Sequence, residues 1–219
     1  MSVGAMTVMV SGMVAGVPGQ AGASWSVLQW VLGLKELGHR VVLVEEVSPE
    51  KLVPAGAPLE ESGNARYFHE LVSEFGIEGD SSLLAGGTTS TAGLSYEALL
   101  RVARECDCLL NTSGTLKDPR ILGTIPKRAY LDVDPAFTQL WDLQGHDRFV
   151  TLGLSIGDAA CPVPTGGRKW IPTLPPVVLS RWPAAAQPPE RPFTTVVNWR
   201  GYGSVEHAGS FYGQKVHSF

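Results

Sequence analysis

The sequence predicts an α/β fold, and three observations along its first fifty residues carry that prediction. Residues 7–11 form a continuous apolar run, which is typical of a parallel strand buried on both faces. A glycine-rich loop over residues 12–22 leads into a segment whose apolar side chains recur at helical spacing until Gly38. A second apolar strand follows at residues 40–44. This order predicts a Rossmann-like parallel sheet with flanking helices.

The alternation of helices and strands continues along the chain. We expect helices over residues 64–75 and 94–105, the second with Ser95 as its N-cap. Strands are expected over residues 106–111, 127–132 and 149–154. Residues 1–179 are therefore predicted to form one Rossmann-like N-terminal lobe.

The composition of the chain changes after this lobe. Proline and alanine dominate residues 180–192, which are predicted to be a semi-rigid linker. A fresh strand is expected at residues 193–199, followed by a glycine-rich turn. We interpret residues 193–219 as the incomplete start of a C-terminal lobe, because one strand and half a helix cannot bury a core.

Charge and cysteine content argue against several classes of protein. The net charge is −4 and no basic stripe is present, so nucleic acid is not an expected partner. Three cysteines at irregular spacing form no disulfide framework, and no pair of His or Cys has zinc-ligand spacing. No apolar run is long enough to span a membrane. We expect a cytoplasmic protein with reduced thiols and predict neither a metal nor a cofactor.

The loop that follows the first strand is a candidate phosphate site. Gly19, Gln20, Ala21 and Gly22 lie where the loop meets the predicted helix. Glycine allows close approach of a ligand to the backbone, and N–H groups at a helix start favour an anion such as a diphosphate. The loop contains neither a G-x-G-x-x-G fingerprint nor a Walker A motif. A flexible strand-to-helix turn remains the alternative interpretation.

Two carboxylates at the end of a later strand are the candidate catalytic residues. Asp132 and Asp134 are separated by one residue, so their side chains are expected to point the same way. A carboxylate at this edge of a sheet can act as a base on a sugar hydroxyl or hold that hydroxyl by hydrogen bonds. The alternative is an Asx turn between Asp134 and Pro135.

Polar residues also close two other predicted strands. Asn111, Thr112 and Ser113 follow one strand and are candidates to bind an acceptor in a crevice, with a plain polar turn as the alternative. Glu45 and Glu46 follow residues 40–44, where an acid in a dinucleotide enzyme would hold a ribose. We favour a solvated strand end for these two acids.

The tryptophans divide into two groups. Trp199, Arg200 and Tyr202 lie in the glycine-rich turn of the second lobe, where a ring could stack and a guanidinium could meet a phosphate. Packing against the rest of that lobe is the alternative. The earlier tryptophans, at positions 25, 30 and 141, are expected in the core rather than as a ligand platform.

Several of these segments together resemble a known family. The segments are GVPGQAGA (16–23), LKELGHRV (34–41), YLDVDPAFTQ (130–139), WIPTLPP (170–176) and NWRGYG (198–203). They are similar to the N-terminal lobe of two-lobed (GT-B) glycosyltransferases, including a group of bacterial glycosyltransferase-like proteins. The chain departs from that family's loop at Ala21, where one of two adjacent glycines is common.

The resemblance implies an enzyme that transfers a sugar from a nucleotide-sugar donor to an unknown acceptor. The N-terminal lobe would bind the acceptor, residues 19–22 would meet the donor diphosphate, and Asp132 or Asp134 would serve as the base. Because the donor-binding lobe is not complete in residues 193–219, the chain alone is expected to be inactive. Two alternatives remain. One is a non-catalytic Rossmann-like module that binds a nucleotide or a partner. The other is a dinucleotide oxidoreductase, which the missing fingerprint disfavours.

Overall fold

The computed structural model describes residues 4–135, 137–141, 143–184 and 204–213. Within them, eight strands form one sheet with the order β4-β3-β2-β1-β5-β6-β7-β8. All neighbouring strands are parallel except β3 and β4, which are antiparallel. The strands are β1 (Thr7–Ser11), β2 (Arg40–Val47), β3 (Ser81–Ala85), β4 (Thr91–Gly93), β5 (Cys108–Thr112), β6 (Arg128–Asp132), β7 (Arg148–Thr151) and β8 (Trp170–Pro172). The predicted α/β, Rossmann-like fold is confirmed.

Four α-helices flank this sheet: α1 (Ala21–Glu36), α2 (Gly63–Glu74), α3 (Tyr96–Glu105) and α4 (Pro119–Thr124). Three of them begin at a side-chain cap, because Ser62, Ser95 and Asp118 accept backbone N–H groups of the first turn. Helix α1 is the exception, since its N-cap residue Gln20 makes no side-chain cap hydrogen bond. The start of α1 therefore has free capacity for an external partner.

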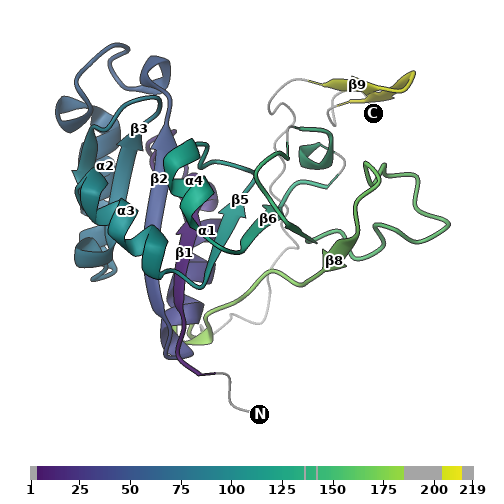
Figure 1. Ribbon diagram of the computed structural model, residues 1–219, viewed down its shortest axis with the longest axis horizontal. Coiled ribbons are helices and arrows are strands. Elements are labelled where there is room, and N and C mark those ends of the chain that lie inside the picture. Colours follow the sequence, from purple (N-terminus) through teal and green to yellow (C-terminus); the bar gives the residue numbers. More distant parts are fainter. Residues whose placement is uncertain (1–3, 136, 142, 185–203, 214–219) are drawn as a thin grey trace, which may run out of the picture.

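The helices cover both faces of the sheet. Figure 1 shows α3 and α4 in front of the sheet and α1 behind it. One core cluster joins residues of α1 and α2, such as Leu28 and Phe68, to β1 and β2. The opposite cluster joins residues of α3 and α4, such as Leu99 and Ile121, to the other face of the same strands. A smaller cluster around Tyr130 and Trp170 closes the β6–β8 end.

Several element boundaries differ from the sequence-based expectation. Strand β2 continues to Val47 rather than ending at residue 44, because Val47 still pairs with Ala85 of β3. Strands β3, β4 and β8 and helix α4 were not predicted. Strand β3 reads SSLLA and contains no β-branched residue, and β4, β8 and α4 are each six residues long or shorter. Elements this short are stabilised mainly by the neighbouring elements they pack against, so the local sequence alone does not predict them.

A segment that we call the strap (residues 173–184) leaves β8 and runs along α1. Its Val178 N–H donates to Gln29 Oε1 at 2.6 Å, and its Ser180 hydroxyl donates to Glu36 Oε1 at 2.5 Å. Its Trp182 ring lies 5.0 Å from the Trp25 ring, centroid to centroid. The strap thus covers the flank of α1 and includes the first residues of the predicted linker.

Beyond the strap, residues 204–213 form a separate hairpin of β9 (Val205–His207) and β10 (Ser210–Tyr212). This hairpin does not pair with the eight-stranded sheet. The strand predicted at residues 193–199 lies outside the described residues. None of the described helices is both long and apolar enough to cross a membrane.

Candidate functional site

The strand order reverses between β1 and β5. The chain leaves β1 through α1 toward β2, whereas it leaves β5 through α4 toward β6 on the other side. The loops after β1 and β5 therefore diverge at the carboxyl edge of the sheet. In open α/β sheets this point forms a crevice where ligands bind. The sequence-predicted site residues of the first lobe lie at the ends of β5 and β6, in the loops that follow β1, β5 and β6, and at the start of α1.

The carboxylate of Glu45 organises the loop that follows β1. Glu45 Oε2 accepts the N–H groups of Val14 at 3.0 Å and Ala15 at 2.6 Å, and Oε1 accepts that of Gly16 at 2.7 Å. A Cβ atom at Gly16 would lie 2.8 Å from Oε1, so the loop approaches the carboxylate too closely for a larger residue. Burial raises the pKa of Glu45 to about 7, although the three N–H groups oppose that rise.

The carbonyl groups of the same loop are fixed from the helices. The Ser24 hydroxyl of α1 donates to Val14 O at 2.8 Å, and Asn64 Nδ2 of α2 donates to Ala15 O at 2.7 Å. Side chains of the protein therefore bind both the N–H groups and carbonyl groups of this loop. An external anion has no access to the N–H groups of residues 14–16, which leaves residues 19–22 as the open part of the loop.

The solvated strand end expected for Glu45 and Glu46 is wrong. The side chain of Glu45 is 1% exposed and lies within β2, not beyond it. Glu46 accepts the N–H groups of Lys117 at 2.6 Å and Asp118 at 2.8 Å. Because consecutive side chains of a strand point to opposite faces, the two acids hold two loops on opposite sides of the sheet.

The four predicted phosphate-binding residues lie at the open rim of the crevice. Gly19, Gln20, Ala21 and Gly22 are all exposed. The N–H of Gln20 donates to Val17 O at 3.3 Å and that of Ala21 to Gly19 O at 3.0 Å, so the turn is internally hydrogen-bonded. Gly22 lies in the uncapped first turn of α1 and has open space around it. Their role toward a phosphate stays a prediction.

The two predicted catalytic carboxylates have different surroundings. Asp132 is 0% exposed, and its Oδ2 accepts Gln139 Nε2 at 2.7 Å together with the Thr151 hydroxyl. Its Oδ1 accepts the N–H of Asp134 at 3.0 Å, so the Asx turn is made by Asp132 rather than by Asp134. Asp134 is half-buried. Asp132 therefore shapes this loop, and Asp134 is the more accessible of the pair.

The predicted acceptor residue Asn111 is bound within its own loop. Its amide exchanges two hydrogen bonds with the backbone of Leu116, at 2.9 and 3.0 Å. Asn111 Nδ2 also lies 3.0 Å from His146 Nε2, and His146 Nδ1 lies 3.2 Å from Leu143 O. Burial lowers the pKa of His146, so the ring is neutral and donates through Nδ1 while Nε2 accepts. His146 lies 35 residues from Asn111, so no local sequence pattern indicates this contact.

The two residues after Asn111 lie at the carboxyl end of β5. Thr112 is buried against the first loop, because a Cβ atom at Gly12 would lie 3.1 Å from Thr112 Cβ. Its hydroxyl has no hydrogen-bond partner among the described residues, and neither has that of Ser11 at the end of β1. Ser113 is half-buried with φ at 53°. Unpaired buried hydroxyls at strand ends are uncommon and favour this edge as a functional site.

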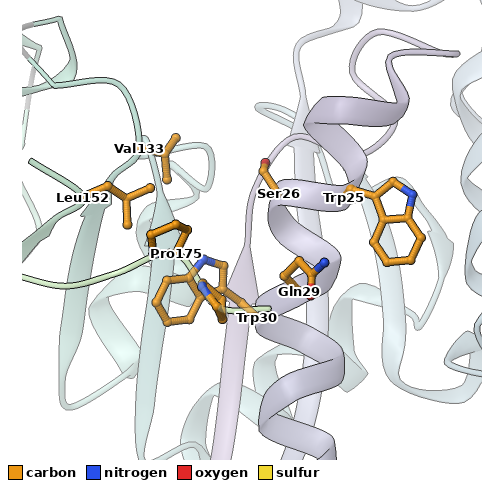
Figure 2. Close-up of a pocket in the computed structure, with 8 residues that line it drawn as sticks. Trp25, Ser26, Gln29, Trp30, Val133, Leu152 and Pro175 are labelled. Atoms are coloured by element: carbon orange, nitrogen blue, oxygen red, sulfur yellow. The ribbon is translucent and has the colours of Figure 1, made fainter. Parts of the chain in front are cut away.

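A groove opens between α1, the carboxyl ends of β6 and β7, and the strap. Its volume is about 410 Å³, and it is lined by Trp25, Ser26, Gln29, Trp30, Val133, Leu152, Pro175 and Pro176. Figure 2 shows Trp30 extending from α1 toward Pro175, with Val133 and Leu152 across the groove. Both tryptophans are half-buried and pack against the core cluster of α1, α2, β1 and β2 while they line the groove.

Other candidate chemistry is limited. Trp199, Arg200 and Tyr202 lie outside the described residues. Across the described ranges, no three His, Cys, Asp or Glu side chains gather closely enough to hold a metal ion. The three cysteines are free thiols, and burial raises the pKa of Cys106 to about 11, which opposes a role as nucleophile.

Comparisons with known proteins find no relative of this chain. No protein-family model, curated protein or solved structure matches the chain. The fold and the site geometry therefore define the class: a Rossmann-like α/β protein whose candidate site lies at the carboxyl edge of its parallel sheet.

Proposed function

We propose that this chain contains the acceptor-binding lobe of a glycosyltransferase that uses a nucleotide-sugar donor. One observation carries the proposal most directly. The uncapped start of α1 lies at the same carboxyl edge as the ends of β5 and β6, beside an open groove of about 410 Å³. A helix start favours a diphosphate, and the groove has room for a ring.

The residue roles follow from accessibility. Within residues 19–22, the donor diphosphate would lie at Gly22 in the first turn of α1, because the N–H groups of residues 14–16 are bound by Glu45 and those of Gln20 and Ala21 by the turn itself. Asp134 would act on the acceptor hydroxyl, since it is half-buried whereas Asp132 is fully buried. Asn111 and Asp132 would position the loops, and Ser113 would contact the ligand at the crevice.

The separate hairpin supports a second structural unit after the strap. Strands β9 and β10 pair with each other and add no strand to the large sheet. This is the arrangement expected if the segment after the linker belongs to another lobe. Donor recognition in a two-lobed enzyme would then depend on that lobe as well.

A second candidate function is a non-catalytic module that binds a nucleotide or a partner protein. It is favoured by the internal hydrogen bonds of Asp132 and Asn111, because these two buried polar groups already serve the fold. Such a module would bind UDP without transferring or hydrolysing a sugar.

The test is calorimetric titration of the chain with UDP, GDP and UDP-glucose, using a pair of matched variants. A Cβ at Gly22 meets no atom within 4 Å, so Gly22→Glu and Gly22→Gln both fit there. Gly22→Glu places a negative charge at the start of α1, which stabilises the helix but repels a diphosphate. We expect the Gln variant to retain nucleotide binding and the Glu variant to lose at least about tenfold in affinity. Equal affinities in the two variants would contradict a diphosphate at residues 19–22.

Binding of UDP-glucose by the parent chain, followed by assay for free glucose, tests the enzyme directly. Release of glucose that Asp134→Asn abolishes would support the enzyme. Binding without any release is expected both of an enzyme whose donor-binding lobe is incomplete and of the non-catalytic module.

A further inference from the structure

Among the described residues, none that lines the groove between α1 and the strap carries a charged side chain. Two indole rings, two consecutive prolines, Val133 and Leu152 form most of its wall. Ser26 and Gln29 are the polar residues of this lining in the part of the chain that the structure describes. A charged ligand would lose its hydration here without gaining a partner, whereas an apolar face would be favoured.

Of the two indoles, Trp25 is engaged with other rings. The Trp25 ring packs edge-on against Phe75 at 5.2 Å and tilts against Trp182 at 5.0 Å, between centroids. These contacts hold it as a fixed wall between α1, α2 and the strap. Trp25 therefore forms one wall of the groove, and its position is set by these ring contacts rather than by a ligand.

Trp30 is different because its ring has no such partner. Within the described part of the chain, the Trp30 indole forms no ring–ring contact and its Nε1–H donates no hydrogen bond. The residue is half-buried, and Figure 2 shows its ring reaching across the groove toward Pro175. A flat indole with an unused donor is a common platform for stacking a ring that carries hydroxyl groups.

The strap fixes the orientation of the Gln29 side-chain amide. Gln29 Oε1 accepts the Val178 N–H at 2.6 Å, which determines the direction of the whole amide. Gln29 Nε2 donates to no group among the described residues, although the residue is largely buried. The Ser26 hydroxyl donates to Ala23 O at 2.7 Å, so its oxygen can still accept. Among the lining residues, Trp30 Nε1, Gln29 Nε2 and Ser26 Oγ are therefore polar atoms with unused hydrogen-bonding capacity.

We propose that this groove binds an uncharged, hydroxylated ring that stacks on Trp30 and accepts hydrogen bonds from Trp30 Nε1 and Gln29 Nε2. The shared chemistry is a flat apolar face with hydroxyl groups at its edge, which both a sugar and a phenolic ring possess. Val133, between Asp132 and Asp134 in the sequence, lines the same groove. That the ring is the acceptor of a transfer rests on the proposed function, whereas its binding in the groove does not.

The experiment follows the six tryptophan indole N–H signals in proton–nitrogen correlation spectra of the whole chain. Trp30→Phe keeps an aromatic wall and removes one signal, which assigns Trp30; Trp141→Phe assigns a control, since Trp141 is 42% exposed and does not line the groove. The probes are methyl β-D-glucopyranoside, phenyl β-D-glucopyranoside, 2-naphthol and phenyl phosphate. We expect a neutral probe to shift the Trp30 signal and leave the Trp141 signal unchanged.

The probes distinguish the source of the ring. A shift with methyl glucoside identifies a sugar, and a shift only with the two aromatic probes identifies a phenolic ring; either result supports the proposal. Phenyl phosphate should bind at least about tenfold more weakly than phenyl glucoside. The proposal is overturned if no neutral probe moves the Trp30 signal at millimolar concentration, if all indole signals move equally, or if phenyl phosphate binds as well.

A matched variant tests the hydrogen-bond donor. Gln29→Glu keeps an oxygen to accept the Val178 N–H but replaces the Nε2 donor by a carboxylate oxygen. We expect this variant to keep its strap and to lose at least about tenfold in affinity for the neutral probe that binds. Unchanged affinity would remove Gln29 from the site. If the chain binds a ring but not UDP, the groove proposal is supported and the proposed function is not. If the chain binds UDP but no ring, the proposed function is supported and the groove proposal is overturned.

Discussion

Glu45 Oε2 accepts the backbone N–H of Ala15 at 2.6 Å, across 30 residues of sequence. With the bonds from Val14 and Gly16, this contact places a buried carboxylate where a phosphate would lie in an open glycine-rich loop. The protein supplies its own anion at the centre of the loop. Its candidate anion site is consequently displaced toward the start of α1.

Replacement of this carboxylate should destabilise the fold. In Glu45→Gln one acceptor oxygen becomes an NH₂ group that faces backbone N–H donors, so at least one buried N–H loses its partner. We expect a loss of about 1–3 kcal/mol in the free energy of unfolding, measured by urea denaturation. Glu46→Gln is the matched control, because Glu46 is only half-buried and its loss should be smaller. An equal loss of unfolding free energy in the two variants would contradict a larger stabilising role for Glu45.

The raised pKa of Glu45 predicts a pH dependence of stability. The carboxyl changes from an ordinary pKa of 4.5 to about 7 on folding, so the folded state holds this proton more tightly than the unfolded state. The free energy of unfolding should therefore fall as the pH rises from about 4.5 to about 7, by at most about 3 kcal/mol. Urea unfolding over this range measures the slope. Glu45→Gln should lack this component, and an identical slope in the variant would assign it to other groups.

The two aspartates should separate stability from activity. Asp132→Asn disrupts the buried contacts with Thr151 and Gln139 and is expected to cost about 1–3 kcal/mol of unfolding free energy. Asp134→Asn, at a half-buried position, should cost less unfolding free energy than Asp132→Asn and should abolish any release of sugar from UDP-glucose that the parent chain shows. Thermal unfolding and the release assay together check both. A stable, inactive Asp132 variant would reverse the two roles.

The strap should loosen when its anchor to α1 is removed. Gln29→Ala deletes the oxygen that accepts the Val178 N–H, while Ser26→Ala alters the same helix without touching the strap. Trypsin should cleave after Arg181 several-fold faster in the Gln29 variant than in the parent, since local opening controls access to such a bond. Mass spectrometry of the early fragments identifies the cut. No change in the cleavage rate would mean that other contacts hold the strap.

The sequence predicted the elements whose signal is local. Strands β1, β2, β5 and β6 are apolar runs, and the Ser95 cap of α3 was placed correctly. Strand β3 was missed because its five residues carry little intrinsic preference. Glu45 was misjudged because its partners lie on a loop that its own neighbours in the sequence do not reveal.

The sequence predicted where the site residues lie in the sheet, but it did not predict which residues surround them. Asp132 and Asn111 were selected because polar residues end two strands, and both do lie at the carboxyl edge. Their partners Thr151 and His146 lie 19 and 35 residues away, and the Gln29–Val178 contact spans 149 residues. Such pairs depend on tertiary packing, which no local pattern encodes. The groove could not be predicted for the same reason.

The most direct measurement maps backbone amide shifts of the chain on addition of UDP-glucose, by proton–nitrogen correlation spectroscopy. We expect shifts at Gly22, Ser113 and Asp134, which belong to the carboxyl edge of the sheet, and none at Gly38, which lies at the opposite edge beside the start of β2. Shifts confined to the opposite edge, or no shifts at millimolar UDP-glucose, would contradict a nucleotide-sugar site at the point where the strand order reverses.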